Sequence, residues 1–572
     1  MNKIWRIKPT PQASVSESLA KAINVNPFLA KLLVQRNIVD FDIAKAYFRP
    51  SLDMLHDPFL MRDMDKAVDR LTKAIISKEK ILVFGDYDVD GTTSVASVYH
   101  FLKNHTGILP ENLAFYIPDR YGEGYGISTK GIDYASENGF SLIISLDCGI
   151  KSIEKIDYAS SKNIDFIICD HHNPGVEIPK AYAVLDPKRA DCQYPYKELS
   201  GCGVGFKFLQ AYCITHQIST EKLYPYLDLL CVSIAADIVP MTGENRIFSF
   251  HGLKKINENP RPGLRALGAV AGFKKELNIS NVVFGFAPRI NAAGRIAHAH
   301  GAVELLLADN EAVAIKFADG LNENNLSRKD FDSSITLEAI EMIEEQENFQ
   351  ALKSTVLFKS DWHKGVVGIV ASRCIEKYYR PTIIFTESNG KATGSARSVD
   401  GFDVYEAICA CSDLLEQFGG HTHAAGMTLE LKNIDAFKAR FEEVVSARIA
   451  PDQLIPKINI DVEVGLDFAS QKTFNIIKQM EPFGPGNMTP VFLTQKLLPE
   501  NPRIVGEKHL KFGVKMPNSN IKKEAIAWGM ADYFEILSSL KPIDICYSLS
   551  ENTFNNITAI ELNIKDIRFS RL

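Results

Sequence analysis

Short apolar runs alternate with longer amphipathic stretches between Lys80 and about Pro187. The apolar runs have the length of strands and cover 81–84, 113–117, 142–146, 164–169 and 183–185. The amphipathic stretches repeat apolar residues at helical spacing over 92–102, 129–137 and 153–161. Strands that alternate with helices of this length predict an α/β fold, in which helices cover the faces of a parallel sheet.

Helical spacing dominates the middle of the chain. Residues 205–260 are mainly helical by this pattern, and a second helical stretch runs from Ala302 to about Glu345. The polar residues Asn322–Asn325 predict a break in that second stretch. We expect it to link two lobes of the molecule.

Two further patterns follow the long helical stretch. Residues 354 to about 450 return to an α/β pattern, with strands expected at 356–358 and 382–385. After Pro451, strands are predicted at 458–464, 491–494, 511–515, 525–528, 543–549 and 558–564. Strands with few helices between them fit a small β-barrel such as an OB-fold.

A chain of 572 residues is too long for one hydrophobic core, so several domains are expected. The patterns divide it into a helical lead-in at 1–55, a parallel-sheet domain at 56–260, a helical connector at 261–348, a smaller α/β domain at 349–450 and a β-barrel at 451–572.

Composition and charge narrow the class of protein. No apolar run approaches the ~18–20 residues that cross a bilayer, and Met1–Gln12 contains no apolar core of a signal peptide. We therefore predict a cytoplasmic protein that does not contact membranes. The ten cysteines contain no Cys-x-x-Cys pair, which argues against a zinc ribbon and a disulfide framework and favours reduced, buried thiols. A net charge of -6 neither supports nor excludes DNA, so any nucleic-acid contact must use local basic patches.

Acidic residues follow three of the predicted strands directly. The strand at 81–84 leads into Asp86, Asp88 and Asp90, the next into Asp147, and the next into Asp170 with His171 and His172. A fourth apolar segment, Leu229–Ala236, leads into Asp237. Because the carboxyl ends of parallel strands share one edge of the sheet, we expect these residues to converge in space.

A cluster of this kind predicts a metal site. Asp86, Asp88 and Asp90 alternate by two and point the same way if the segment stays extended. Several carboxylates packed together without a cation would have strongly raised pKa values, and a metal removes that conflict. Carboxylates with one or two imidazoles suit Mn²⁺ or Mg²⁺ better than zinc, and so many ligands could hold two ions about 3.5–4 Å apart.

The same residues have other interpretations. A lone Asp after a strand is usually a turn residue or a helix cap, and a lone His-His is usually a surface pair. Four such elements at one predicted sheet edge argue against a purely structural cluster. An EF-hand is rejected because its twelfth position must be Glu, and here that position is Ser97.

Taken together, these motifs resemble those of the DHH phosphoesterase superfamily. The matching segments are Asp86–Gly91, Asp147–Gly149, Asp170–His172 and Ala236–Asp237. Further segments narrow the resemblance to the RecJ family of single-strand-specific exonucleases, and they lie at 117–120, 123–126, 288–295, 321–329, 394–398, 419–426 and 482–487. The resemblance covers roughly residues 50 to 570, in the order of the family.

The resemblance implies a role for each residue of the cluster. Asp88 would bind one ion, Asp90 the other, and Asp147 both. His171 and Asp237 would complete the second ion's shell, and Asp86 is a further candidate ligand. His172 would lie beside the scissile phosphate, and Asp170 would orient a histidine. The two ions, Mn²⁺ or Mg²⁺, would activate a shared water near neutral pH.

The resemblance also implies a second, substrate-binding domain of the DHHA1 type at 349–450. The expected phosphate-binding residues are Arg120, Arg289, Asn291, Ser395, Arg397 and His421. Arginine suits this task because its planar fork binds phosphate oxygens with two hydrogen bonds. The alternative is that these arginines form salt bridges between domains.

The function implied is a metal-dependent exonuclease that degrades single-stranded DNA from its 5′ end to mononucleotides, in DNA repair and recombination. A narrow cleft would exclude duplexes, and the OB-like domain would hold the following nucleotides with Arg503, Lys508, Lys511, Phe512 and Lys515. The family implies single-strand-binding protein and a RecQ-type helicase as partners, and we expect a monomer. Two alternatives are a phosphoesterase for short oligonucleotides or cyclic dinucleotides, and a non-catalytic single-strand-binding replication scaffold.

Overall fold

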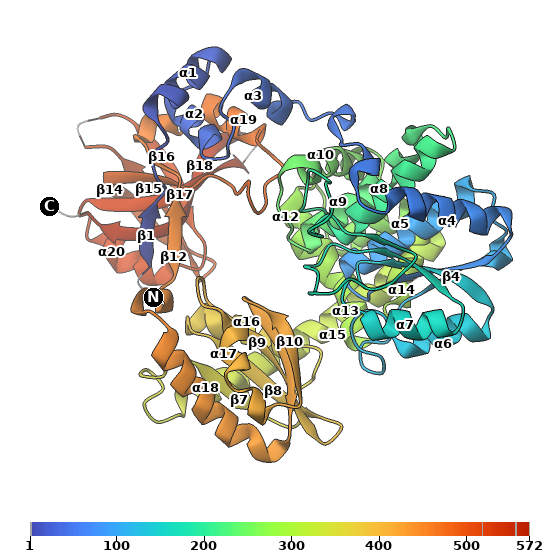
Figure 1. Ribbon diagram of the computed structural model, residues 1–572. Helices are drawn as coiled ribbons and strands as arrows, with labels where there is room; N and C mark the ends of the chain where they lie inside the picture. Colours follow the sequence, from blue (N-terminus) through green and yellow to red (C-terminus); the bar gives the residue numbers. More distant parts are fainter. Residues whose placement is uncertain (1–2, 518, 555–556, 571–572) are drawn as a thin grey trace. The chain divides into compact units, whose positions relative to one another are not determined.

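The computed structural model describes residues 3–517, 519–554 and 557–570 (Figure 1). The chain forms two compact units. One comprises residues 35–325 and 478–489, and the other comprises 1–34, 326–477 and 490–572. Residues 3–34 belong to the unit that contains the carboxyl-terminal domains.

The parallel sheet is present as predicted, with strand order β3-β2-β4-β5-β6. Its strands are β2 (Lys80–Gly85), β3 (Leu113–Tyr116), β4 (Phe140–Leu146), β5 (Asp165–Cys169) and β6 (Ala183–Leu185), and every pairing in it is parallel.

Both faces of this sheet are buried, which is why its strands are apolar without alternation. Alternate side chains of β2 enter different cores: Ile81 and Val83 face one, Leu82 and Phe84 the other. The first core also contains side chains of α4 (Met64–Ile76), α5 (Val89–His105), α8 (Gly201–Thr215) and α9 (Leu227–Ala236). The second contains side chains of α6 (Thr129–Glu137) and α7 (Ile153–Ser161).

Helices complete this unit after α9. They are α10 (Gly243–Glu258), α11 (Pro262–Val270), α12 (Ile279–Asn281), the π-helix η5 (Val282–Phe286), α13 (Ala287–Ile296) and α14 (His300–Leu307). Residues 205–260 are mainly helical, as the sequence predicts.

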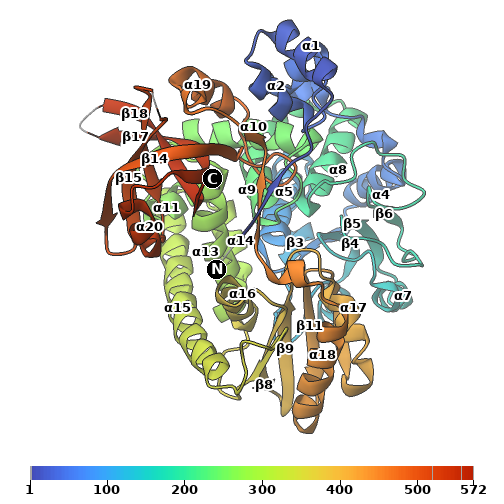
Figure 2. The ribbon, with the colours of Figure 1, turned by 90° about the vertical axis from the view of Figure 1, so that its left-hand side faces the viewer.

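The long helical stretch differs from its prediction. Helix α15 (Glu311–Glu344) continues for 34 residues without the break predicted at Asn322–Asn325, and Figure 2 shows it as one helix. The interruption lies earlier, between α14 and α15. Asn325 is fully buried on α15, so packing keeps this polar segment helical.

The smaller α/β domain has a mixed sheet of order β10-β11-β9-β8-β7. Its strands are β7 (Thr355–Phe358), β8 (Thr382–Ser388), β9 (Lys391–Arg397), β10 (Gln417–His421) and β11 (Ala424–Leu429). Helix α16 (Val367–Lys377) packs against β8 and β9 and shares a core with α15. Helices α17 (Val404–Cys409) and α18 (Ile434–Arg448) share a second core with the sheet.

The carboxyl-terminal strands form a closed barrel, as the OB-like pattern predicts. The order β14-β15-β16-β18-β17 is closed by pairing of β14 with β17. The strands are β14 (Phe492–Val505), β15 (His509–Lys515), β16 (Lys522–Ala527), β17 (Ile543–Phe554) and β18 (Ile557–Phe569), with α20 (Phe534–Ser538) between the third and fourth.

The beginning of the chain is not wholly helical, so the prediction of a helical lead-in is wrong in part. Strand β1 (Ile4–Ile7) pairs in parallel with β12 (Lys457–Ile460), and the predicted strand at 458–464 is split into β12 and β13 (Val462–Glu463). Helices α1 (Ala13–Ile23), α2 (Pro27–Val34) and α3 (Phe41–Phe48) follow β1. A four-residue strand with a partner some 450 residues away leaves no local signal.

The cysteines behave as predicted. All ten are free thiols, and Cys409 is the one that is not fully buried. Among the described residues, no helix combines the length and the apolar character needed to span a membrane.

Candidate metal centre

Acidic residues of three neighbouring strands meet at the carboxyl edge of the parallel sheet. Asp86 follows β2, Asp147 follows β4 and Asp170 follows β5, and these three strands are adjacent. All three carboxylates are buried, with at most 2% of each residue exposed. The predicted convergence of these residues therefore holds at this edge.

Asp86, Asp88 and Asp90 do not form one extended ladder, so that part of the prediction is wrong. Asp88 caps the amino terminus of α5, and its Oδ1 accepts a 3.0 Å hydrogen bond from the Gly91 amide. Asp90 already lies in the first helical turn. This turn needs glycine at position 91, because a Cβ there would lie 2.3 Å from the Asp86 carbonyl oxygen.

The carboxylate of Asp90 is clamped by residues that the sequence analysis did not single out. Its Oδ2 accepts a hydrogen bond from the Gly201 amide at 2.7 Å, and its Oδ1 accepts one from Cys202 at 2.8 Å. The Ser233 hydroxyl donates a third, also at 2.8 Å. Gly201 opens α8, so the Asp90 carboxylate sits at a helix amino terminus, where amides and the helix dipole favour negative charge.

Gly201 also lets α8 approach the sheet edge. A Cβ at Gly201 would lie 2.6 Å from the Cβ of Asp147. Asp147 itself has φ 61°, an uncommon backbone conformation for a residue other than glycine. The glycine-rich start of α8, with Gly201, Gly203 and Gly205, is the sequence signal that could have indicated this close approach.

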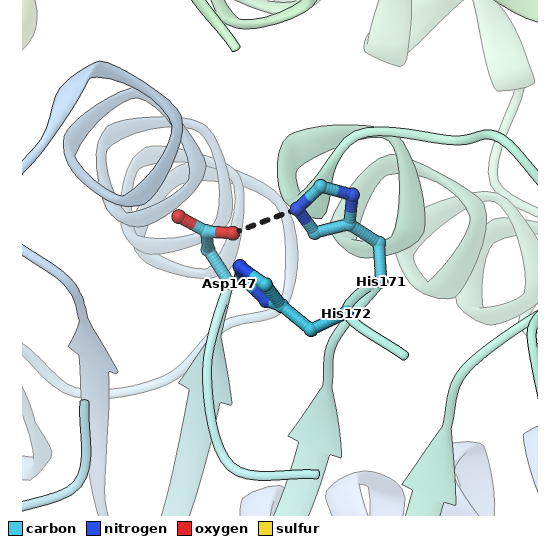
Figure 3. A group of neighbouring side chains, drawn as sticks. All are labelled: Asp147, His171 and His172. Atoms are coloured by element: carbon cyan, nitrogen blue, oxygen red, sulfur yellow. Dashed lines mark ion pairs between the residues drawn. The ribbon is translucent and has the colours of Figure 1, made fainter. Parts of the chain in front are cut away.

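His171 points its Nε2 atom at three carboxylates. Nε2 lies 3.1 Å from Asp147 Oδ1, 3.5 Å from Asp237 Oδ2 and 3.7 Å from Asp90 Oδ2. Figure 3 shows the ring of His171 directed at Asp147, with His172 beside it. Both ring nitrogens of His171 are buried and have no hydrogen-bond partner among the described residues. Asp237 reaches this point from the carboxyl end of α9.

The electrostatics of the cluster favour a bound cation. Burial, together with the neighbouring carboxylates, raises the pKa of Asp86, Asp88 and Asp147 above the ordinary range of an aspartate. Burial and the charges of Asp90 and Asp88 raise the pKa of Asp237 to about 8. These acids oppose one another's ionisation, and a divalent ion removes that penalty.

The donor set fits hard divalent ions. The ligand atoms of Asp90, His171 and Asp237 all lie within 4.8 Å of one another, and so do those of Asp147, His171 and His172. Oxygen ligands with one or two imidazoles suit Mn²⁺ or Mg²⁺. His171 belongs to both groups.

Asp170 holds the neighbouring histidine rather than joining the acidic cluster. Its Oδ1 accepts a 2.7 Å hydrogen bond from His172 Nδ1, and its Oδ2 accepts one from the Ile150 amide. Burial alone would lower the pKa of His172, but the hydrogen bond and charge of Asp170 raise it to about 9. Despite its burial, these contacts lower the pKa of Asp170 to about 2. Asp170 therefore orients the His172 ring and favours its protonated form.

Two tyrosines beside the cluster were not among the predicted site residues. The Tyr125 hydroxyl lies 3.1 Å from His172 Nε2, and its ring meets Tyr87 edge to face at 6.1 Å. The guanidinium of Arg120 lies 4.9 Å from the centre of the Tyr87 ring, and its charge acts on Asp86. Tyr125 lies within the segment 123–126 that carries part of the family resemblance, and this segment was the available signal.

Arg289 lies on α13, where its guanidinium makes three hydrogen bonds. It donates to Asn322 Oδ1 at 3.0 Å, to the Gly285 carbonyl at 2.8 Å and to the Val270 carbonyl at 3.3 Å. All three acceptors are neutral, so the charge of Arg289 is not neutralised by these contacts. Asn291 lies two residues further along α13 and is half-buried.

The remaining three predicted phosphate-binding residues share one sheet of the other unit. Arg397 donates to the Ser395 hydroxyl at 2.8 Å, and both lie on β9. In register, Ala424 of β11 pairs with Arg397 on one side and with His421 of β10 on the other. Gly368, in the first turn of α16, approaches this pair so closely that a Cβ would lie 2.8 Å from the Arg397 guanidinium and 2.9 Å from Ser395 Oγ.

Comparisons with known proteins agree with this division of the chain. Residues 80–234 match the model of the DHH family, N-terminal domain, residues 348–447 match the DHHA1 domain, and residues 460–566 match the RecJ OB domain.

Similar proteins cover the chain almost completely. The single-stranded-DNA-specific exonuclease RecJ of Bacillus subtilis is 35% identical over 99% of this chain and 71% of that protein. The enzyme of the same name from Dickeya dadantii is 30% identical over 98% of both chains. The crystal structure of Thermus thermophilus RecJ in complex with Mn²⁺ covers 100% of this chain and 80% of that one, with 28% identity and a TM-score of 0.85.

Proposed function

Because the chain belongs to the RecJ family of single-stranded-DNA-specific exonucleases, we propose that it hydrolyses single-stranded DNA from the 5′ end to mononucleotides with Mn²⁺ or Mg²⁺. DNA repair and recombination in the cytoplasm are the processes that such an activity serves. The observation that carries the proposal is the buried acidic cluster around His171 Nε2.

The residues that would hold two ions are those brought together at the sheet edge. Asp90, His171 and Asp237 form one group, Asp147 adjoins His171, and Asp86 and Asp88 complete the cluster. Divalent ions bound there would neutralise the carboxylates and polarise the phosphoryl oxygens of the substrate. The protein supplies their rigid frame, since Asp90 is clamped at the amino terminus of α8.

His172 supplies a positive charge for the scissile phosphate. Its Nδ1 is engaged by Asp170, so Nε2 is the atom that can reach a substrate oxygen, with the Tyr125 hydroxyl beside it. An imidazolium fixed in this way stabilises negative charge that develops on the phosphoryl group. His172 is thus a catalytic residue of the proposed reaction, and Asp170 is its positioning residue.

The 5′-terminal phosphate would bind at β9 and α16. Ser395 and Arg397 offer a hydroxyl and a guanidinium on one face of the sheet, and His421 lies two strands away. The first turn of α16 has no side-chain cap, so its amides add to the attraction for an anion. On the catalytic domain, the residues that would contact the DNA are Arg120, Arg289 and Asn291.

The barrel domain favours a long single strand as the substrate over short oligonucleotides or cyclic dinucleotides. Residues 460–566 match an OB domain, and OB-folds bind single strands. A single-strand-binding protein and a RecQ-type helicase are the partners that would present such strands, and we expect the enzyme to act as a monomer.

End-labelled DNA tests the proposal. Single strands and duplexes that carry a 5′ or a 3′ label are digested with Mn²⁺, with Mg²⁺ and with EDTA. The 5′ label should appear first as a mononucleotide, the duplex should resist, and EDTA should abolish the reaction. Release of internal fragments, loss of the 3′ label first, or equal activity in EDTA would each contradict the proposal.

A further inference from the structure

The outer face of the barrel is defined by the alternation of its second and third strands. On β15, Leu510 and Phe512 point inward and are at most 1% exposed, which turns His509 and Lys511 outward. On β16, Ala525 and Ala527 are fully buried. In OB-folds, this face of the second and third strands binds oligonucleotides. The outer face of β15 and β16 is therefore the candidate face for binding single-stranded DNA.

Trp528 lies at one end of this face and is 60% exposed. It continues the register of β16, in which Ala527 pairs with Leu510, and so it lies opposite His509. The other two tryptophans are engaged differently. Trp362 is 4% exposed and donates to Glu338, and Trp5 donates to Asp566. Trp528 is therefore the tryptophan whose indole is open to solvent.

The two rings are held in place by the backbone. His509 and Trp528 meet edge to face with centroids 4.8 Å apart. The Gly529 amide donates a 2.9 Å hydrogen bond to His509 Nδ1, and Gly529 has φ 68°, which favours glycine. The rings are thus arranged before any ligand binds, which reduces the conformational entropy lost on binding.

The charges on this face are largely paired within the protein. Lys511 lies 3.0 Å from Glu561, and Lys515 and Lys522 lie 2.6 and 2.8 Å from the two oxygens of Glu500. Because their charges are paired with glutamates, these lysines attract DNA phosphates less strongly than the sequence suggests. Base stacking on an aromatic ring does not depend on such charges, and it tolerates any sequence because every base has a π face.

We propose that Trp528, supported by His509, is a base-stacking platform for single-stranded DNA on the OB domain. The inference rests on the proposed function for the identity of the ligand. It names the side chains that bind a base outside the reaction centre. It also assigns the binding of the DNA on this domain to an aromatic ring rather than to lysines.

Binding is measured on the full-length protein in EDTA, so that hydrolysis does not interfere. The probe is a fluorescein-labelled oligo(dT) of about 20 nucleotides. Trp528→Leu keeps an apolar side chain without a π face, and loss of stacking should weaken binding about tenfold. Trp528→Phe keeps a ring and should bind within about twofold of the wild type. Phe569→Leu, at an exposed ring of the same domain on β18, is the matched control and should bind normally.

Intrinsic fluorescence provides a second measurement. Unlabelled oligo(dT) should quench part of the wild-type tryptophan emission, and Trp528→Phe should lose this quenching because the other two tryptophans do not contact the base. If Trp528→Leu binds oligo(dT) as tightly as the wild type, the proposal is overturned. The exposed rings would then bind another ligand, such as a protein. Equal weakening in the Leu and Phe variants would indicate a packing role and would also overturn it.

The two proposals fail separately. If the wild type does not hydrolyse labelled single strands with Mn²⁺, the proposed function is wrong, while the EDTA binding comparison still reports on the platform. If hydrolysis is normal but oligo(dT) neither quenches emission nor depends on the ring at 528, the platform alone is wrong.

Discussion

The imidazole of His171 cannot donate a hydrogen bond to every carboxylate that surrounds it. Three carboxylates from different elements lie within 3.7 Å of its Nε2, and a single proton on that atom can serve only one of them. Divalent ions that share these ligands would satisfy all of them, and this is the physical reason for assigning the cluster to metal binding.

Removing the charge of Asp147 should remove turnover but keep substrate binding. Asparagine is the appropriate replacement because it tolerates the positive φ of this position, whereas alanine would add backbone strain. We expect Asp147→Asn to lower kcat by at least about a hundredfold, with single-strand affinity changed less than about twofold. Steady-state kinetics and binding of labelled oligo(dT) provide the measurements. Asp157→Asn, at an exposed position on α7, is the control, and unchanged turnover in Asp147→Asn would refute the role of this residue.

The charge of His172 should matter more for turnover than for binding. We expect His172→Gln to lower kcat by about a hundredfold with little change in KM, because the imidazolium acts on charge that develops during the reaction. Asp170→Asn should cause a similar but smaller loss, since it removes the partner that keeps the ring protonated and oriented. A change confined to KM in both variants would assign the pair to ground-state binding instead.

At the scale of elements, helix ends build the site. Helix α5 begins at the acidic motif, α8 begins at the Asp90 carboxylate and α9 ends at Asp237. Parallel strands bring the residues to one edge, and the amino termini of two helices stabilise the negative charge there. The close approach of α8 depends on glycine.

Gly201→Ala should weaken metal binding. The new Cβ would lie 2.6 Å from Asp147 Cβ, so either α8 or Asp147 must move. We expect Mn²⁺ affinity to fall about 10–100-fold, which is typical when residues that support metal ligands are replaced. Titration calorimetry measures the affinity. Gly320→Ala, on α15, is the control because its Cβ would meet nothing within 4 Å, and the helix propensity of alanine should stabilise it by about 0.5–1 kcal/mol. Equal Mn²⁺ affinity in both variants would contradict the argument.

His100 on α5 should make the catalytic domain sensitive to acid. Burial and the charge of Arg261 lower its pKa from 6.5 to about 4, and its Nδ1 lies 2.8 Å from the Tyr226 hydroxyl. The folded state therefore binds fewer protons than the unfolded state between these pH values, so stability should fall as pH falls from 6.5 to 4. Urea midpoints at several pH values should show a shallower loss in His100→Asn than in the wild type. Parallel curves for the two proteins would exclude His100 as a cause.

At the scale of the whole molecule, the metal centre belongs to one compact unit and the barrel to the other. All six candidate ligands lie within residues 35–325, whereas the OB strands lie within 490–572. A ligand that binds only the folded catalytic unit stabilises that unit by mass action, by about 2.7 kcal/mol at one hundred times its Kd.

Mn²⁺ should therefore protect one part of the chain selectively. Hydrogen exchange followed by mass spectrometry should show slower exchange at the carboxyl ends of β2, β4 and β5 and in the first turns of α5 and α8. Residues 490–572 should not change. Asp147→Asn is the control and should reduce the protection. Uniform protection of the whole chain, or none, would contradict a metal centre confined to this edge.

Much of the fold and of the site could be predicted from the sequence, because the relevant signals are local. The strands of the parallel sheet are continuous apolar runs, and the acidic residues follow them directly, so strand order along the chain was enough to predict convergence of Asp86, Asp147 and Asp170. The OB-like barrel was likewise visible in the strand pattern after Pro451.

Tertiary structure alone decided the features that depend on distant contacts. The clamp of Gly201 and Ser233 on Asp90, the contact of Tyr125 with His172, and the pairing of β1 with β12 join segments that no local pattern connects. The burial of Asn325 kept α15 continuous where its polar residues predicted a break. Local periodicity reports which face of an element is apolar, whereas the partner of that face is fixed only when the elements pack.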